Sequence, residues 1–169
     1  ALRGEEKVVV KIYRLETADF KRMYEYIKPD PRYDSLAKRR REIIFAWAQR
    51  EYRNLLAARR AMVKAPLPIV FMKNILVMSL IGDNKAAPMM KDDLPANPAK
   101  FLDEIVQNMK KFYDGGFVHG DLSKFNILNH NNKPVLIDFS QASPVKWPIA
   151  KDMLIRDIHN VCEFFKKQD

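Results

Sequence analysis

The sequence predicts an α+β fold that combines a small antiparallel sheet with several helices in a chain of 169 residues. Three observations predict it. A β-branched segment stands near the start of the chain, two hairpin patterns follow, and three segments show helical apolar spacing. The composition, 47% hydrophobic and 30% charged, is sufficient for a buried core.

The first predicted strand spans residues 7–13. Its β-branched and almost wholly apolar sequence is typical of a strand that is buried on both faces, yet Lys11 lies in its middle. Residues 16–33 are predicted to be rich in turns and without regular structure, since they end in Pro29-Asp30-Pro31.

A long helix is predicted over residues 36–63, with Ser35 as its N-terminal cap. Glu51 falls on the apolar stripe of this helix. The stripe follows steps of three and four residues and comprises Ile44, Trp47, Ala48, Leu55, Ala58 and Met62.

The rest of the chain alternates hairpins and helices. Turn and cap signals predict a hairpin, a helix that begins at Asn97-Pro98 and ends at Gly115, a second hairpin and a last helix. The two hairpins pair residues 69–72 with 75–81 and 127–129 with 134–137, and the last helix covers 150–167. The buried side of that helix is predicted to hold Met153, Leu154, Ile158, Val161, Cys162 and Phe165, with the single cysteine as an inert, reduced thiol.

Two classes of protein are excluded by pattern. The five glycines form neither a GxGxxG nor a GxxxxGK[ST] motif, so neither a Rossmann nor a Walker-type nucleotide site is expected. The apolar runs are far shorter than a membrane span and no signal peptide opens the chain. We therefore expect a soluble, cytoplasmic protein that makes no membrane contact.

The formal net charge of +9 is concentrated in one segment. Residues 32–64 contain ten Lys or Arg and three acidic residues, which accounts for most of the excess. Such a segment attracts polyanions such as RNA through counterion release, although a solvated helix face is an equally good interpretation. No DNA-binding motif is present.

Three polar residues near the second hairpin point to phosphoryl transfer. This reaction needs a carboxylate to orient the attacking hydroxyl and oxygen ligands for Mg²⁺. Asp121 and Asn126, five positions apart, can serve the nucleophile and the metal, and Asp138 ends an apolar strand twelve positions later. Isolated Asp and Asn are usually turn residues, but this combination is a strong signal.

Two charged residues in apolar settings form a second constellation. Lys11 in the first strand and Glu51 in the helix stripe are each costly to bury alone, so we expect an ion pair. The ammonium would then reach nucleotide phosphates. In the alternative interpretation Lys11 extends to solvent and Glu51 pairs with Arg50 or Arg53.

These motifs together resemble the RIO family of atypical serine/threonine protein kinases. The resemblance covers nearly the whole chain and is carried by segments 10–14, 47–55, 76–82, 87–92, 119–128, 137–142 and 150–165. Within the family, Ser140-Gln141 is similar to the first subfamily, of archaeal type.

The resemblance implies a small bilobal kinase-like fold, with an N-lobe of antiparallel sheet and long helix and a mostly helical C-lobe carrying the catalytic-loop hairpin. Residues 1–81 would be a partial N-lobe and residues 82–169 the hinge and C-lobe. The resemblance also implies the residues of the site. For ATP, Lys11 would bind the phosphates and be held by Glu51, Met78 would be the gatekeeper, and the backbone of Ser79 and Ile81 would bind adenine. For catalysis, Asp121 would be the base, Asn126 and Asp138 would bind Mg²⁺, Asp138 would also accept phosphate, and Asp157 would brace the catalytic loop.

The family acts in maturation of the small ribosomal subunit, through ATP binding and hydrolysis as much as through phosphorylation. The resemblance therefore implies ATP and Mg²⁺ as cofactors and a pre-ribosomal partner for the basic segment 32–64. Two alternatives remain, a small-molecule phosphotransferase of the aminoglycoside or choline type and a non-catalytic, nucleotide-switched ribosome-binding module.

The chain also departs from ordinary kinases. Only ten residues precede Lys11, where a kinase has two strands and a phosphate-covering loop, so we expect these elements to be missing through N-terminal truncation. No Ala-Pro-Glu motif follows Asp138, and a conventional peptide-docking platform is not expected.

Overall fold

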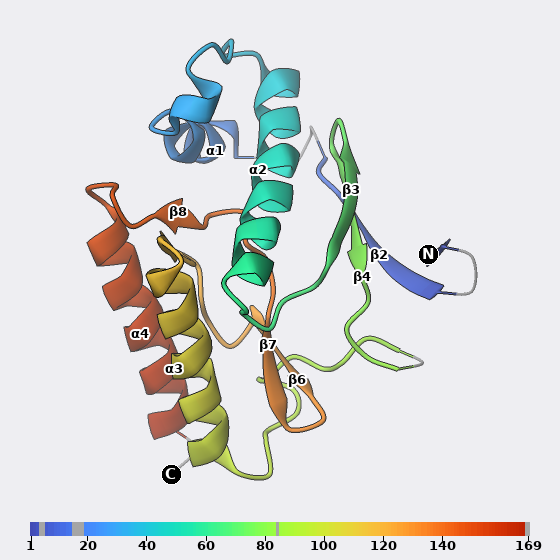
Figure 1. The fold of residues 1–169 in the computed structure, drawn as a ribbon, viewed down its shortest axis with the longest axis vertical. Coiled ribbons are helices and arrows are strands. Elements are labelled where there is room, and N and C mark those ends of the chain that lie inside the picture. The colour runs from blue at the N-terminus through green and yellow to red at the C-terminus, as the bar shows by residue number, and fades with distance from the viewer. Residues whose placement is uncertain (4–5, 15–18, 84, 168–169) are drawn as a thin grey trace.

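The fold was taken from a computed structural model that describes residues 1–3, 6–14, 19–83 and 85–167. Its elements form two lobes (Figure 1). The upper lobe contains a sheet and two helices, and the lower lobe contains two long helices beside a hairpin. The predicted α+β class and the two-lobed arrangement are therefore confirmed.

The N-lobe sheet has the strand order β1-β2-β4-β3, and every neighbouring pair is antiparallel. The strands are β1 (Leu2–Arg3), β2 (Glu6–Ile12), β3 (Pro68–Met72) and β4 (Ile75–Ser79). In this register Lys11 lies opposite Leu76 in the central pair. The second strand of the predicted hairpin ends at Ser79 rather than at residue 81.

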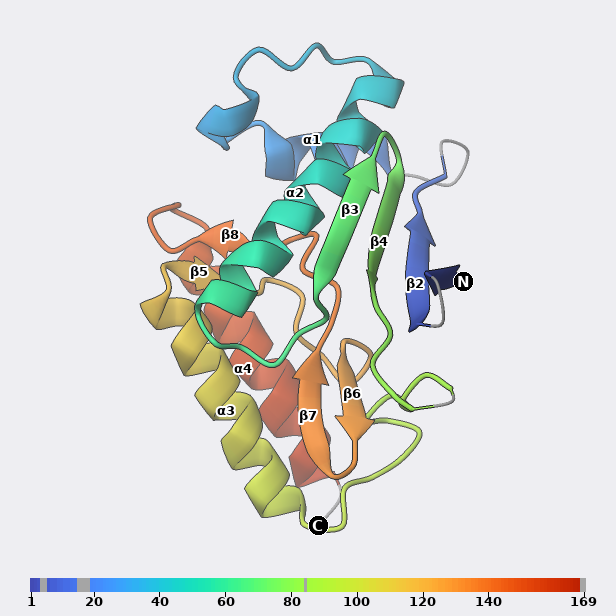
Figure 2. The same cartoon turned by 45° about the vertical axis from the view of Figure 1, so that its right-hand side comes forward.

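Strand β2 is not buried on both faces, contrary to the prediction from its apolar sequence. Val8 is buried, but Val9, Val10 and Ile12 are 37%, 39% and 59% exposed. Helix α2 (Arg40–Arg60) packs against β3 and β4, so the β2 side of the sheet is less covered (Figure 2). An antiparallel sheet can leave apolar residues open in this way.

Helix α1 (Phe20–Ile27) lies in the stretch that was predicted to be turn-rich, so that prediction was wrong over these residues. The side chain of Asp19 caps it by accepting from the Arg22 N–H at 3.0 Å. Met23 and Ile27 are buried against α2. An eight-residue helix gains its stability from such packing rather than from propensity. Residues 16–18 of the stretch lie outside the described residues.

Helix α2 is shorter than the predicted 36–63. Its N-cap is Arg39, which makes no side-chain capping bond, so Ser35 is not the cap. At the other end Met62 has φ 59° and is 75% exposed, because the chain turns away after Ala61. The other residues of the predicted stripe are buried, namely Ile44, Trp47, Ala48, Leu55 and Ala58.

The C-lobe helices and strands come after the segment that links β4 to helix α3. Helix α3 (Pro98–Asp114) starts as predicted, with the Asn97 side chain accepting from the Lys100 N–H at 2.9 Å. The remaining elements are β5 (Phe117–Val118), β6 (Ile127–His130), β7 (Lys133–Leu136), β8 (Ser143–Pro144) and α4 (Ala150–Lys166). Strands β6 and β7 form the predicted second hairpin, and β5 pairs with β8.

One side of α4 packs into the lobe and the other does not. Met153, Val161 and Phe165 are buried, whereas Ile158 is 46% exposed, against the prediction. Cys162 is only partly buried and lies in an apolar groove between α3 and α4, so it is not a core thiol. No helix in the described ranges is long and apolar enough to cross a membrane.

Candidate active site

Lys11 joins three elements at the face between the lobes. Its Nζ lies 2.9 Å and 3.0 Å from the two carboxylate oxygens of Glu51 on α2, and 2.9 Å from Oδ1 of Asp138 after β7. The expected Lys11–Glu51 pair is thus confirmed over the local alternatives. Arg50 instead donates to Ser143 Oγ, and Arg53 lies over the Tyr33 ring, so neither guanidinium neutralises Glu51.

The three charges have unequal protonation behaviour. Burial raises the pKa of Glu51 to about 7, against the opposing effect of Lys11. Burial also works against the charged form of Lys11 and of Asp138. The mutual attraction nevertheless prevails, since the pKa of Lys11 is raised and that of Asp138 is lowered. Lys11 is therefore a fixed positive charge between two carboxylates, one of them fully buried.

The loop between β5 and β6 brings Asp121 and Asn126 together. The Asn126 amide donates to the backbone oxygen of Asp121 at 2.8 Å and to its Oδ2 at 3.4 Å. Burial and then the charge of Asp138 raise the pKa of Asp121. A carboxylate with a raised pKa accepts a proton more readily, which suits a base.

His119 holds this loop in place through two hydrogen-bond contacts. Its Nε2 lies 3.1 Å from the Ile137 carbonyl, and its Nδ1 accepts from the Asp121 N–H at 3.4 Å. Burial lowers the pKa of His119 to about 4, so the ring is neutral at pH 7. A neutral ring with one donor nitrogen and one acceptor nitrogen matches both contacts. His119 thereby links the Asp121 loop to the strand that leads to Asp138.

Helix α4 holds the same loop through Asp157. Its carboxylate accepts from the backbone N–H groups of Gly120 at 2.7 Å and Leu122 at 2.8 Å. Gly120 has φ 79°, and a Cβ there would lie 2.0 Å from the Met153 side chain. The positive φ favours glycine at this position, and the predicted bracing contact of Asp157 is present.

Asp138 occupies an unusual backbone position. Its φ is 61°, a conformation that non-glycine residues adopt rarely. Ser140 Oγ donates to Asp138 Oδ1 at 2.7 Å, the same oxygen that accepts from Lys11. The carboxylate is thus oriented from two sides, and Oδ2 makes no hydrogen bond within the described part of the chain.

Two residues that sequence reasoning did not assign to the site hold the segment after Asp138. The Asn54 amide donates to the carbonyls of Phe139 and Ala142, both at 2.9 Å. Arg50 donates to Ala142 O and to Ser143 Oγ, both at 3.0 Å. The signal in the sequence was a pair of polar residues, four positions apart, within the apolar part of α2 beside Glu51.

The donor set suits a hard cation. Asn126 Oδ1 and the Asp138 carboxylate are oxygen ligands of the kind that Mg²⁺ prefers. No cluster of three His, Cys, Asp or Glu side chains that could hold a metal occurs among the residues that the structure describes. The protein would therefore supply about two ligands, and nucleotide phosphates and water would complete the shell.

The predicted adenine-binding residues lie at the end of β4. Met78 is buried at the junction between the lobes. The Ser79 N–H donates to Leu67 O at 2.9 Å, so it is not free for a ligand. The Ile81 carbonyl accepts from the Ala87 N–H at 2.8 Å, whereas the Ile81 N–H has no partner among the described residues. Of these two residues, only Ile81 keeps an N–H without a partner within the described ranges.

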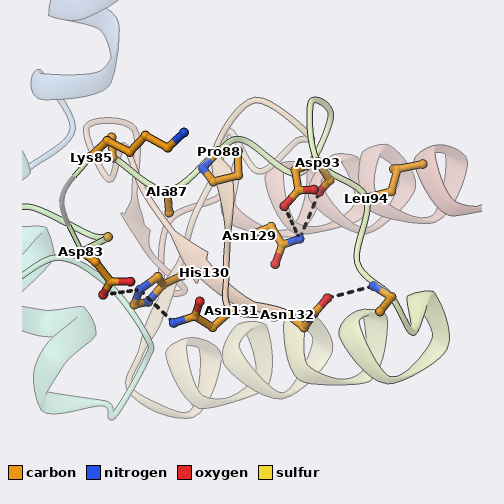
Figure 3. A pocket seen from close by; sticks show the side chains of 13 residues that line it. Asp83, Lys85, Ala87, Pro88, Asp93, Leu94, Asn129, His130, Asn131 and Asn132 are labelled. Carbon is orange, nitrogen blue, oxygen red and sulfur yellow. Dashed lines mark hydrogen bonds and ion pairs between the residues drawn. The ribbon is translucent and has the colours of Figure 1, made fainter.

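A pocket of about 590 Å³ is lined by the chain segment after β4 and by the turn between β6 and β7 (Figure 3). There Asn129 donates to the Asp93 carboxylate at 3.1 Å, and His130 Nε2 lies 3.9 Å from Asp83 Oδ1. None of the predicted site residues lines this pocket. We therefore place the candidate site at the Lys11–Asp138 cluster, where the titratable groups converge.

The RIO domain family matches residues 1–169, the entire sequence. The chain belongs to the RIO family. Relatives include the RIO-type serine/threonine-protein kinases Rio1 of Methanocaldococcus jannaschii, 42% identical, and of Haloferax volcanii, 37% identical, each over 99% of this chain. The chain spans 58% and 59% of the length of these two relatives. The names agree with the predicted first subfamily.

The fold of the RIO domain is also seen in solved structures. The Rio2 kinase of Chaetomium thermophilum, in a complex with ADP, Mg²⁺ and phosphoaspartate, superposes with a TM-score of 0.71 at 22% identity. The superposition covers 96% of this chain and 49% of the Rio2 chain. At this identity the likeness confirms the kinase-like fold alone.

Proposed function

We propose that this RIO domain is the catalytic part of a cytoplasmic, ATP- and Mg²⁺-dependent serine/threonine kinase or ATPase that acts in maturation of the small ribosomal subunit. The observation that carries the proposal is the convergence of Lys11, Glu51 and Asp138 from three elements. Membership of the RIO family favours this function over a small-molecule phosphotransferase.

Each residue of the cluster has a role in this proposal. Lys11, held by Glu51, binds the phosphates of ATP, and the Ile81 N–H donates a hydrogen bond to the adenine. Asn126 and Asp138 would hold Mg²⁺, which would offset the negative charge of the phosphates. Asp121 accepts the proton of the attacking hydroxyl or water. The oxygen of that hydroxyl or water bonds to the γ-phosphorus, and ADP leaves.

A second acceptor is available within the same site. The free Oδ2 of Asp138 can itself attack the γ-phosphorus, which forms an acyl phosphate and releases ADP. Asp138 is ionised, so no base is needed for that step. Asp121 then accepts a proton from the water that hydrolyses the acyl phosphate. The Rio2 structure named above contains a phosphoaspartate.

Incubation with γ-labelled ATP and Mg²⁺ tests the proposal. We expect label as free phosphate and on the protein itself, in an acid-stable serine or threonine form or a hydroxylamine-sensitive acyl form. Asp121→Asn should cut phosphate release at least about 100-fold, in the range of general-base loss. Asp103→Asn on exposed α3 is the matched control. Equal turnover in all three proteins would refute the proposal.

A further inference from the structure

A second cavity, of about 550 Å³, lies on the α2 helix away from the Lys11 cluster. Its lining comes from the C-terminal half of α2 with the residue after it, from β5, from the end of α3 and from Arg32. Figure 2 shows the C-terminal end of α2 beside β5. The lining of the cavity comprises Arg32, Arg53, Leu56, Ala57, Arg60, Ala61, Gly115 and Phe117. Three of these eight residues are arginines and none is acidic.

The arginines of this cavity differ in how far their charges are already neutralised. Arg32 pairs with the Asp30 carboxylate through two nitrogens, so its charge is compensated. Arg53 lies over the Tyr33 ring, with 5.7 Å from its Cζ to the ring centroid. Neither Arg53 nor Arg60 makes an ion pair with any residue in the described ranges. Two guanidinium groups therefore remain without a counter-charge.

The spacing of these two arginines suits a repeating anion. Arg53 and Arg60 are seven positions apart on one face of α2, which places them about 10 Å apart along the helix axis. Leu56, Ala57 and Phe117 give the cavity an apolar floor between them. Guanidinium groups bind phosphate oxygens through two parallel hydrogen bonds.

We propose that this cavity binds two phosphates of a single-stranded RNA, with a ribose or base against the apolar floor. A polynucleotide can satisfy both arginines at once, whereas a single phosphoserine would satisfy one. The excess positive charge along residues 32–64 extends the attraction beyond the cavity. The inference rests on the proposed function only in taking a ribosomal RNA as the natural polyanion.

Fluorescence anisotropy with a labelled 12-nucleotide single-stranded RNA, in the absence of ATP, tests the site. We expect R53Q/R60Q to weaken binding at least about tenfold and to reduce the slope of log K against log salt by about 1.4, as for two phosphate contacts. R39Q/R41Q removes the same charge from the other end of α2 and is the matched control. It should weaken binding less than threefold.

Two outcomes would overturn this inference. Equal losses in R53Q/R60Q and R39Q/R41Q would mean that a diffuse positive field, and no defined site, attracts RNA. Tight binding of a phosphoserine peptide with no binding of RNA would assign the cavity to a different ligand. R60Q alone spares the Arg53–Tyr33 contact and guards against loss of folding. ATP turnover should be unchanged in R53Q/R60Q, so failure here is separable from failure of the proposed function.

Discussion

Lys11 and Asp138 are 127 positions apart in the sequence, yet Lys11 Nζ and Asp138 Oδ1 are 2.9 Å apart in the structure. This contact joins the central strand of one lobe to the end of a hairpin in the other. Glu51 completes it from α2. The candidate site therefore exists only when both lobes and the helix are in their places.

The first prediction concerns the buried partner of Lys11. Glu51→Gln removes the charge that holds the ammonium from the α2 side, so Lys11 would be drawn toward Asp138 and away from nucleotide. We expect ATP affinity to fall about tenfold, equivalent to about 1.4 kcal/mol, by calorimetric titration. Glu42→Gln, a partly exposed residue in the first turn of the same helix that pairs with Arg39 and not with Lys11, should leave affinity unchanged. Similar affinities in both variants would count against the role of Glu51.

The second prediction concerns Asn54, whose amide donates to two carbonyls that follow Asp138. Asn54→Ala removes both of these buried hydrogen bonds, so we expect the free energy of unfolding to fall by about 2 kcal/mol. We also expect weaker Mg²⁺-dependent ATP binding, because the segment that carries Asp138 loses its anchor.

Asn108→Ala is the matched control for Asn54. Asn108 is also buried and makes two hydrogen bonds, to Lys64 N and Glu104 O, but lies on α3 away from the site. Chemical denaturation should show a similar loss of stability with normal ATP binding. If both variants bind ATP equally, Asn54 has only a structural role.

The third prediction compares two glycines with positive φ. Gly120 and Gly116 have φ 79° and 87°, but only a Cβ at Gly120 would clash, with Met153 at 2.0 Å. Gly116→Ala should cost about 1 kcal/mol of backbone strain. Gly120→Ala should cost more, about 2 kcal/mol, because the buried Met153 side chain must also move aside, and it should lower ATP turnover. Equal thermal shifts in the two variants would contradict the packing argument.

The fourth prediction is a pH dependence of stability. The pKa of His119 is about 4 in the folded chain against the ordinary 6.5, because the ring is buried. Between these values the unfolded chain binds a proton that the folded chain does not, so stability falls as pH falls. From pH 7 to pH 5 the loss from this group is about 2 kcal/mol.

Denaturation at both pH values can isolate this effect. The stability advantage of the unaltered protein over His119→Gln should shrink by that amount at pH 5, while His159→Gln, on an exposed part of α4, should show no such change. A constant difference between the unaltered protein and His119→Gln would show that burial does not keep His119 neutral.

The sequence was most informative where function constrains residue type. Lys11 in an apolar strand and Glu51 in an apolar stripe are costly alone, and that cost correctly predicted their pairing. Asp121 and Asn126 also lie together as their spacing suggested. For Lys11 and Glu51, a charged residue within an apolar pattern indicated that a partner of opposite charge lies far away in the sequence.

The errors arose where tertiary contacts decide the outcome. Helix α1 is too short to show clear periodicity, and its packing on α2 is visible only in the fold. The openness of β2 depends on which strands α2 covers, and no pattern within residues 7–13 encodes that. The anchoring role of Asn54 depends on the path of the chain after Asp138. Both ends of the long helix, predicted over 36–63 with Ser35 as its cap, were misplaced by three or four residues.

The central claim is that Asp138 couples Mg²⁺ to nucleotide binding, and titration of ATP with and without Mg²⁺ tests it most directly. We predict that Mg²⁺ tightens ATP binding at least about tenfold in the unaltered protein and that Asp138→Asn abolishes this gain, while Asp92→Asn, on an exposed loop, retains it. An undiminished Mg²⁺-dependent gain in Asp138→Asn would contradict the account.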